Sequence, residues 1–314
     1  MGMGAFLEIR KAAANANQVL LLLVLGTAIS GCSTIRTGAV NMIGDALSGG
    51  GNVYMSDNDP ELIREALPFG LKTYESLLAV SPEHRGLLLA SANGFAAYAY
   101  ILGQEADRLE NSDLAAARER RERAKLLFLR GRDYAIRGLE TSHANFMEGL
   151  YRQRDATIAA TDIEDIGFLY WAGASWAGAL SVAKDDPELI ADLPIAGAMV
   201  ARVLELDETY QDGAAHTFFI SYEGSRPGGD KQKARSHYER AYELSAGKNA
   251  GVHLALAEAV AVPEQNLAEF RSLVTTALAV EPDEAPDIRL VNIMAMRRAE
   301  WLETQIPELF FEAD

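Results

Sequence analysis

The sequence predicts an all-α protein in which tetratricopeptide-like helical hairpins stack into one right-handed superhelical body. Apolar residues recur at intervals of three and four along most of the chain, as the buried face of a helix requires. The segment Asp-Pro-Glu-Leu-Ile occurs twice, at residues 59–63 and 186–190, and repeated helix starts are typical of helical-repeat proteins. No segment between turn residues alternates apolar and polar side chains over the length of a strand.

Residues 1–31 have the features of a cleaved lipoprotein signal peptide. A basic pair at residues 10–11 precedes an apolar run at residues 19–29, which is long enough for a signal sequence and too short to span a bilayer. The tetrapeptide Ile-Ser-Gly-Cys at residues 29–32 resembles the lipobox at which bacterial lipoproteins are cut and acylated. We therefore expect a lipid anchor on Cys32; a small buried cysteine is the alternative. Because Cys32 is the only cysteine in the chain, no internal disulfide is expected.

Residues 32–58 are expected to form a flexible, lipidated tether between the anchor and the folded body. Three glycines at residues 49–51, with asparagine and serine residues nearby, are typical of such linkers. No Gly-Lys-Ser or Gly-Lys-Thr follows the glycines, so the segment does not match a phosphate-binding loop. Residues 59–314 are then expected to form the all-α domain.

The helices of this domain have recognisable starts. Asp59 and Asp186 each precede a proline, which predicts an aspartate N-cap followed by a proline in the first turn, where its missing N–H costs nothing. The spacing of Thr161 and Glu164 matches a capping box, and Asp230 follows a glycine-rich turn. Helical patterns extend over residues 83–103, 112–140, 161–184, 214–222, 230–242, 248–260, 264–280 and 286–303.

The segment at residues 204–242 is the clearest hairpin. A helix over residues 214–222 is followed by a turn and by a second helix that buries Ala234, Tyr238 and Ala241. Small and large side chains alternate on this face as in the inner seam of a tetratricopeptide-type hairpin, because a ring packs only where its neighbours are small. The connecting loop is longer than such repeats prefer, which indicates a degenerate copy.

Composition and motif spacing argue against several function classes. The chain has 45 acidic and 29 basic side chains and a net charge of −16, whereas nucleic-acid binding needs basic surfaces. The five histidines show no spacing typical of a metal site. Ser175 lies in Gly-Ala-Ser-Trp-Ala-Gly, which misses the nucleophile elbow by one residue and lacks the preceding strand. We expect no catalytic residue, no metal and no cofactor.

Four aromatic residues are candidates for the lining of a pore: Tyr98, Tyr170, Trp171 and Trp176. They lie in helical segments that are rich in alanine and glycine. Close helix packing explains this composition, because helix crossings need small residues. The functional alternative is that these faces do not close completely and leave an aromatic-lined passage for an apolar or amphipathic ligand.

Three arginines, Arg130, Arg132 and Arg137, are candidates for an anion-binding site. With Glu105 and Asp107 they would form surface ion pairs, which contribute little stability. Alternatively, they form a fork that binds the carboxylate of a ligand. The sequence leaves both interpretations open.

Several motifs together resemble the T-component lipoproteins of TRAP-type (tripartite ATP-independent periplasmic) transporters. They occur in order over nearly the whole mature chain, and each motif alone would be weak evidence for the family. The motifs are Asp-Asn-Asp-Pro at 57–60, Gly-Phe-Ala-Ala-Tyr-Ala-Tyr at 94–100, Glu-Ala-Asp-Arg at 105–108, Leu-Tyr-Trp at 169–171, Lys-Asp-Asp-Pro at 184–187 and Tyr-Glu-Gly-Ser-Arg-Pro-Gly at 222–228.

The resemblance implies an all-α lipoprotein with a lengthwise pore. It implies a body that faces the periplasm and assembly as a homotrimer. The membrane anchor is expected from the lipobox, and Ser33 after the cysteine, by resemblance to enterobacterial lipoprotein sorting, favours the outer membrane. The expected partner is the solute-binding P-component, to which the protein would pass a small hydrophobic or amphipathic ligand without covalent chemistry. The family supplies no residue-level site to carry over. Fold alone favours another function, an envelope scaffold that recruits proteins and binds no small molecule.

Overall fold

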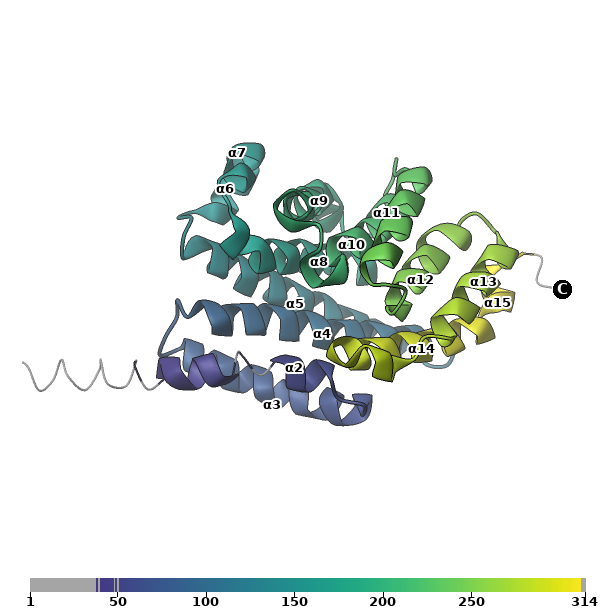
Figure 1. Cartoon of the computed structure of the whole chain (residues 1–314), viewed down its shortest axis with the longest axis horizontal. Coiled ribbons are helices and arrows are strands. Elements are labelled where there is room, and N and C mark those ends of the chain that lie inside the picture. The colour runs from purple at the N-terminus through teal and green to yellow at the C-terminus, as the bar shows by residue number, and fades with distance from the viewer. Residues whose placement is uncertain (1–37, 39, 48, 50, 312–314) are drawn as a thin grey trace, which may run out of the picture.

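The computed structural model describes residues 38, 40–47, 49 and 51–311 (Figure 1). Within this part of the chain every regular element is a helix, which confirms the all-α prediction. Residues 1–31 and Cys32 lie outside the described residues, so the signal peptide and the acylation site stay predictions.

Short turns connect the helices. The first part of the chain contains α2 (Gly51–Met55), α3 (Pro60–Leu78), α4 (Arg85–Leu109), α5 (Leu114–Glu140), α6 (Phe146–Arg152), α7 (Arg154–Ala159), the 3-10 turn η1 (Ile163–Asp165) and α8 (Ile166–Val182). The second part contains α9 (Pro187–Asp207), η2 (Tyr210–Asp212), α10 (Ala214–Ser225), α11 (Lys231–Leu244), α12 (Ala250–Leu256), the π-helical turn η3 (Ala257–Ala261), α13 (Leu267–Leu278), η4 (Pro282–Glu284), η5 (Pro286–Ile288), α14 (Arg289–Thr304) and α15 (Ile306–Leu309). The sequence patterns predicted the long helices and missed the short α6 and α7.

The predicted aspartate caps are present. The Asp59 carboxylate accepts hydrogen bonds from the backbone N–H groups of Glu61 and Leu62, both at 3.1 Å. Asp186 caps α9 through the same two positions, and Asp230 caps α11. The repeated Asp-Pro segments therefore begin two helices in the same way.

The cap before α8 lies one residue later than predicted. Asp162 and Asp165 form the capping box, whereas the sequence spacing indicated Thr161 and Glu164. Thr161 is buried, and its hydroxyl donates to the carbonyl of Ile158 at 2.7 Å. This bond closes α7, so the threonine is not available to begin the next helix.

The long helices form the layers of the molecule (Figure 1). α3, α4 and α5 lie side by side, α8 packs on α4 and α5, and α9 packs on α8. Buried side chains of these helices form a large apolar cluster, which includes Leu88, Trp176 and Met199, and a smaller one, which includes Leu71 and Phe95. Helices α10 to α14 surround a second cluster, which includes Ile220 and Phe270.

Within the described residues, α4 is the one helix whose length and apolar content suit a membrane span. Its most apolar window is 50% buried inside the protein, and α3, α5 and α8 all contact it. We therefore assign α4 to the core of the body.

The last long helix returns to the N-terminal layer. α14 contacts both α2 and α3. Arg289 donates to the backbone carbonyl of Ser56 at 2.9 Å, across 233 residues of sequence, and Arg297 pairs with Glu61 at 3.0 Å. The two ends of the helical series therefore lie in contact.

The described part of residues 32–58 differs from the predicted flexible tether. Residues 40–47 form a helix, called the N-terminal helix below, and α2 follows. Ser81 donates to the side chain of Asn41 at 2.7 Å. Gly44 lies so close to the His84 ring that a Cβ there would be 2.6 Å from Nε2. Because this glycine permits close packing, the N-terminal helix docks on the body, which begins before residue 59.

Candidate functional site

Aromatic side chains of α8 and η2 form the best-defined candidate for a ligand surface. The rings of Tyr170 and Trp171 meet edge to face with centroids 5.1 Å apart, and Tyr210 lies 5.6 Å from Tyr170. Tyr210 packs closely on α8: a Cβ added at Gly167 of this helix would lie 3.3 Å from the Tyr210 hydroxyl. All three aromatic side chains are partly exposed. We call these three residues the aromatic cluster.

The aromatic cluster is neutral at physiological pH. Burial raises the pKa of Tyr170 above its ordinary value and raises the pKa of Tyr210 to about 12. The side-chain amide of Gln211 donates to the hydroxyl of Tyr210 at 3.1 Å. The cluster therefore offers apolar rings with polar tips, which suits an apolar or amphipathic ligand.

The other two predicted pore residues lie in different surroundings. Trp176 is 1% exposed, and the Arg132 guanidinium lies 4.7 Å from the centre of its ring. Tyr98 is 8% exposed and packs in a separate cluster with Leu71 and Phe95. The positions of Trp176 and Tyr98 agree with the packing interpretation, whereas Tyr170 and Trp171 lie together.

The three predicted anion-binding arginines on α5 point to different partners. Arg130 pairs with Glu75 on α3. Arg137 donates to a backbone carbonyl in the turn before α4, at 3.2 Å. Arg132 lies over Trp176 on the side of α8. These side chains do not converge as a fork.

Glu105 and Asp107, the expected partners of those arginines, bind others instead. Glu105 accepts a hydrogen bond from Arg120 at 2.6 Å. Asp107 accepts one from Arg298 of α14 at 2.8 Å, across 191 residues of sequence. Arg298 also donates to both carboxylate oxygens of Glu258, at 3.2 and 2.8 Å. This network joins α4, η3 and α14.

Arg298 is the central cation of this network. Its side chain is 12% exposed. Burial alone lowers its pKa, but Glu258 and Asp107 more than compensate and hold the pKa above its ordinary value. Sequence reasoning missed this network, because no local pattern links helices so far apart in the chain.

A pair of histidines joins α10 to α11. His216 and His237 have their Nδ1 atoms 2.9 Å apart, and Nε2 of His216 lies 3.4 Å from Glu208. Burial lowers the pKa of both rings. Across the described chain, no group of three or more His, Cys, Asp or Glu residues is arranged to hold a metal ion.

Ser175, the serine closest to a nucleophile motif, lies inside the protein. It is 0% exposed, and its hydroxyl would be 3.2 Å from a Cβ at Gly131 on α5. No hydrogen-bond partner activates the hydroxyl. Ser175 therefore serves the contact between α8 and α5.

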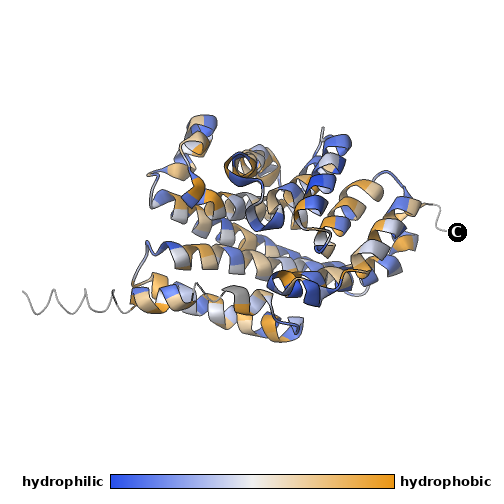
Figure 2. Cartoon of the chain, in the orientation of Figure 1, coloured by the Kyte–Doolittle hydropathy of each residue, from blue (hydrophilic) through white to orange (hydrophobic). Residues whose placement is uncertain are grey.

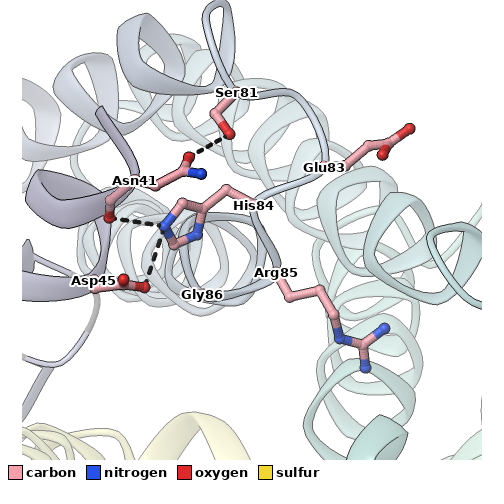
Figure 3. Close-up of a pocket in the computed structure, with 7 residues that line it drawn as sticks. All are labelled: Asn41, Asp45, Ser81, Glu83, His84, Arg85 and Gly86. Atoms are coloured by element: carbon pink, nitrogen blue, oxygen red, sulfur yellow. Dashed lines mark hydrogen bonds and ion pairs between the residues drawn. The ribbon is translucent and has the colours of Figure 1, made fainter. Parts of the chain in front are cut away.

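An open recess lies where the N-terminal helix meets the start of α4 (Figure 3). His84 Nε2 is 3.2 Å from the Asn41 carbonyl and 3.3 Å from the Asp45 carboxylate, while Nδ1 accepts from the backbone N–H of Leu87. Arg85 points away from these groups and binds Asp165. The polar groups of the recess thus hold the N-terminal helix on the body. The recess has a volume of about 480 Å³ and is lined by Asn41, Asp45, Ser81, Glu83, His84, Arg85 and Gly86.

Comparison with known proteins identifies the family. The model of the TRAP transporter T-component family (TAtT) matches residues 56–310. The chain belongs to this family. It is also similar to an uncharacterized protein of Treponema pallidum (strain Nichols), with 29% identity over 268 residues that cover 83% of each chain. The family match includes every helix from α3 to α15.

Membership confirms the resemblance seen in the sequence motifs. The protein is an auxiliary component associated with TRAP transport in the bacterial envelope, and its family is associated with transport rather than with catalysis.

Proposed function

We propose that this T-component protein is a periplasm-facing lipoprotein that binds the P-component and passes it a hydrophobic or amphipathic ligand. Acylated Cys32 would anchor it, with the outer membrane as the favoured location, and a homotrimer would be the functional unit. Family membership supports the association with a TRAP system. Stacked tetratricopeptide-like hairpins would supply the body and its pore.

The aromatic cluster is the observation that supports ligand binding. Trp176, on the same helix, is fully buried, as a ring needed for packing is expected to be. Tyr170 and Trp171 are partly exposed although they lie on α8, which α4, α5 and α9 surround. Edge-to-face contacts fix the orientation of the rings, so a ligand would meet a preorganised surface.

Co-purification tests the transport role. The native acylated protein is isolated from its own membranes together with bound proteins, and organic extracts of the complex are analysed by mass spectrometry. We expect the P-component and a small apolar or amphipathic molecule. A preparation that contains neither contradicts the transport role and favours an envelope scaffold.

The variant Trp171→Ala tests the aromatic cluster. In a titration with a fluorescent fatty-acid analogue, we expect about tenfold weaker binding, equivalent to about 1.4 kcal/mol, because an aromatic contact is lost. Tyr151→Ala is the matched control, since this aromatic residue is 58% exposed and lies on α6, whose main contacts are with α5 and α7. Circular dichroism verifies that helicity is retained. Equal affinity in Trp171→Ala and the wild type contradicts the assignment.

A further inference from the structure

The N-terminal helix packs its polar side on the body. Asn41 binds Ser81 and His84, Asp45 faces the His84 ring at 3.3 Å, and Gly44 between them is buried. A helix on the surface of a globular protein normally packs its apolar side inward. The arrangement of this helix is therefore inverted.

The opposite side of the N-terminal helix is apolar and exposed. Met42, Ile43 and Leu47 are 76%, 51% and 39% exposed. With about 3.6 residues per turn, these positions lie on the side of the helix away from Asn41 and Gly44. We call Met42, Ile43 and Leu47 the apolar face; Figure 2 shows apolar residues on this part of the chain.

α2 and α3 also expose apolar side chains. Phe69 of α3 is 81% exposed and Val53 of α2 is 70% exposed. Phe69 lies on the side of α3 away from Leu71, which is buried against α4. α2 covers α3 next to this ring, because the Tyr54 hydroxyl would lie 3.1 Å from a Cβ at Gly70. Apolar side chains exposed in this number over residues 42–69 favour a protein or membrane contact.

The start of the described chain indicates which contact this is. Gly38 is six residues after Cys32, and a six-residue segment reaches at most about 20 Å in any conformation. Acyl chains on Cys32 would therefore hold the N-terminal helix within about 20 Å of the lipid. The net charge of −16 opposes attraction to anionic headgroups, so apolar side chains are the suitable means of contact.

We propose that the apolar face of the N-terminal helix lies in the interfacial region of the bilayer and orients the body against the membrane. This inference rests on the proposed acylation of Cys32. Hydrogen bonds from His84 and Ser81 fix the helix to the start of α4, so the contact would set the direction of the whole body. The layers formed by α5, α8 and α9 then extend away from the lipid (Figure 1), whereas α14 lies back against α2 and α3.

Single-cysteine labelling tests this orientation. Since Cys32 is the only native cysteine and acylation consumes its thiol, an environment-sensitive fluorophore attaches only at an introduced cysteine. The full-length protein is produced in its host, matured, and reconstituted in phosphatidylethanolamine–phosphatidylcholine nanodiscs. Met42→Cys and Leu47→Cys report on the apolar face. Ile163→Cys is the control, because this residue of η1 is similarly exposed, at 54%.

We expect a blue-shifted emission and strong quenching by brominated lipid at Met42→Cys and Leu47→Cys, and neither effect at Ile163→Cys. Labels that stay in water at all three positions overturn the proposal. Labels that are shielded from iodide at Met42 but not quenched by brominated lipid indicate a second protein copy on this face and also overturn it. The mass of the Cys32 peptide reports separately on acylation, so failure of the anchor and failure of the apolar face are distinguishable.

Discussion

The Nδ1 atoms of His216 and His237 lie 2.9 Å apart, so in the neutral pair one ring donates and the other accepts. Only one proton fits between the two nitrogens. Protonation of both rings would break the bond and place two positive charges between α10 and α11, close to Arg240, which also lowers the pKa of His216.

We expect acid to destabilise the protein through this pair. Burial holds the pKa of both histidines below the ordinary value of 6.5. The neutral forms therefore favour folding: their contribution is fully present above pH 6.5 and is lost as the pH falls through the lower folded-state values. The midpoint of urea unfolding, measured from about pH 7.5 to about pH 5, should decrease.

The variant His237→Phe separates the effect of histidine protonation on stability from the effect of carboxylate protonation. The ring keeps its stacking on Phe219 but loses the titrating nitrogen, so the pH dependence should become flatter. Burial also lowers the pKa of His253, so this histidine retains part of the pH dependence of stability. An identical slope in the wild type and in His237→Phe would show that the pair does not control acid stability.

The cap of α3 should contribute measurable stability. Asp59→Ala removes the acceptor of two backbone hydrogen bonds, and we expect a loss of about 1 kcal/mol in the free energy of unfolding. Asp59→Asn retains an acceptor at the same position and should remain close to the wild type. Urea denaturation compares the three proteins. Equal loss in both variants would mean that the charge of Asp59 matters rather than its capping geometry.

Arg298→Met should destabilise the contact of α14 with α4. The substitution leaves Asp107 and Glu258 without their shared cation, and we expect a cost of about 2 kcal/mol, less than for a fully buried pair because both carboxylates are partly exposed. Arg297→Ala is the matched control: this neighbour is 44% exposed and pairs with Glu61, so its loss should cost less than about 1 kcal/mol. Similar unfolding midpoints for the two variants contradict this assignment.

Two substitutions at Trp176 should separate packing from hydrogen bonding. Trp176→Ala leaves a large cavity and should cost about 3–5 kcal/mol. Trp176→Phe keeps a ring and removes an indole N–H that has no hydrogen-bond partner, so its cost should be well below that of alanine. Thermal denaturation measures both. A mild effect of Trp176→Ala would show that this ring is not a core residue.

Local sequence signals predicted the long helices because their causes are local. Asp59, Asp186 and Asp230 each cap a helix through atoms two or three residues away. The docking of the N-terminal helix was missed because it depends on His84, 40 residues after Gly44. Glycine and asparagine residues are typical of a linker, and only the tertiary contact shows that Gly44 makes room for a ring.

Local signals in the sequence located only part of the candidate site, because its residues come from segments far apart in the chain. Aromatic residues in a glycine-rich segment directed attention to α8, but this helix has no charged side chain, so periodicity does not tell its buried side from its accessible side. Trp171 and Trp176 were therefore indistinguishable. Tyr210 and Arg298 come from distant segments, and no spacing in the sequence connects them with Tyr170 or Asp107.

The contacts of α14 with α2 and α3 bear on how the protein unfolds. A linear helical array frays from its ends, since each terminal unit has a single neighbour. In this chain Arg289 and Ser56 join the two termini of the series, so neither end opens without loosening the other. We expect backbone amides of α3 and α14 to exchange with deuterium in one cooperative step rather than one after the other.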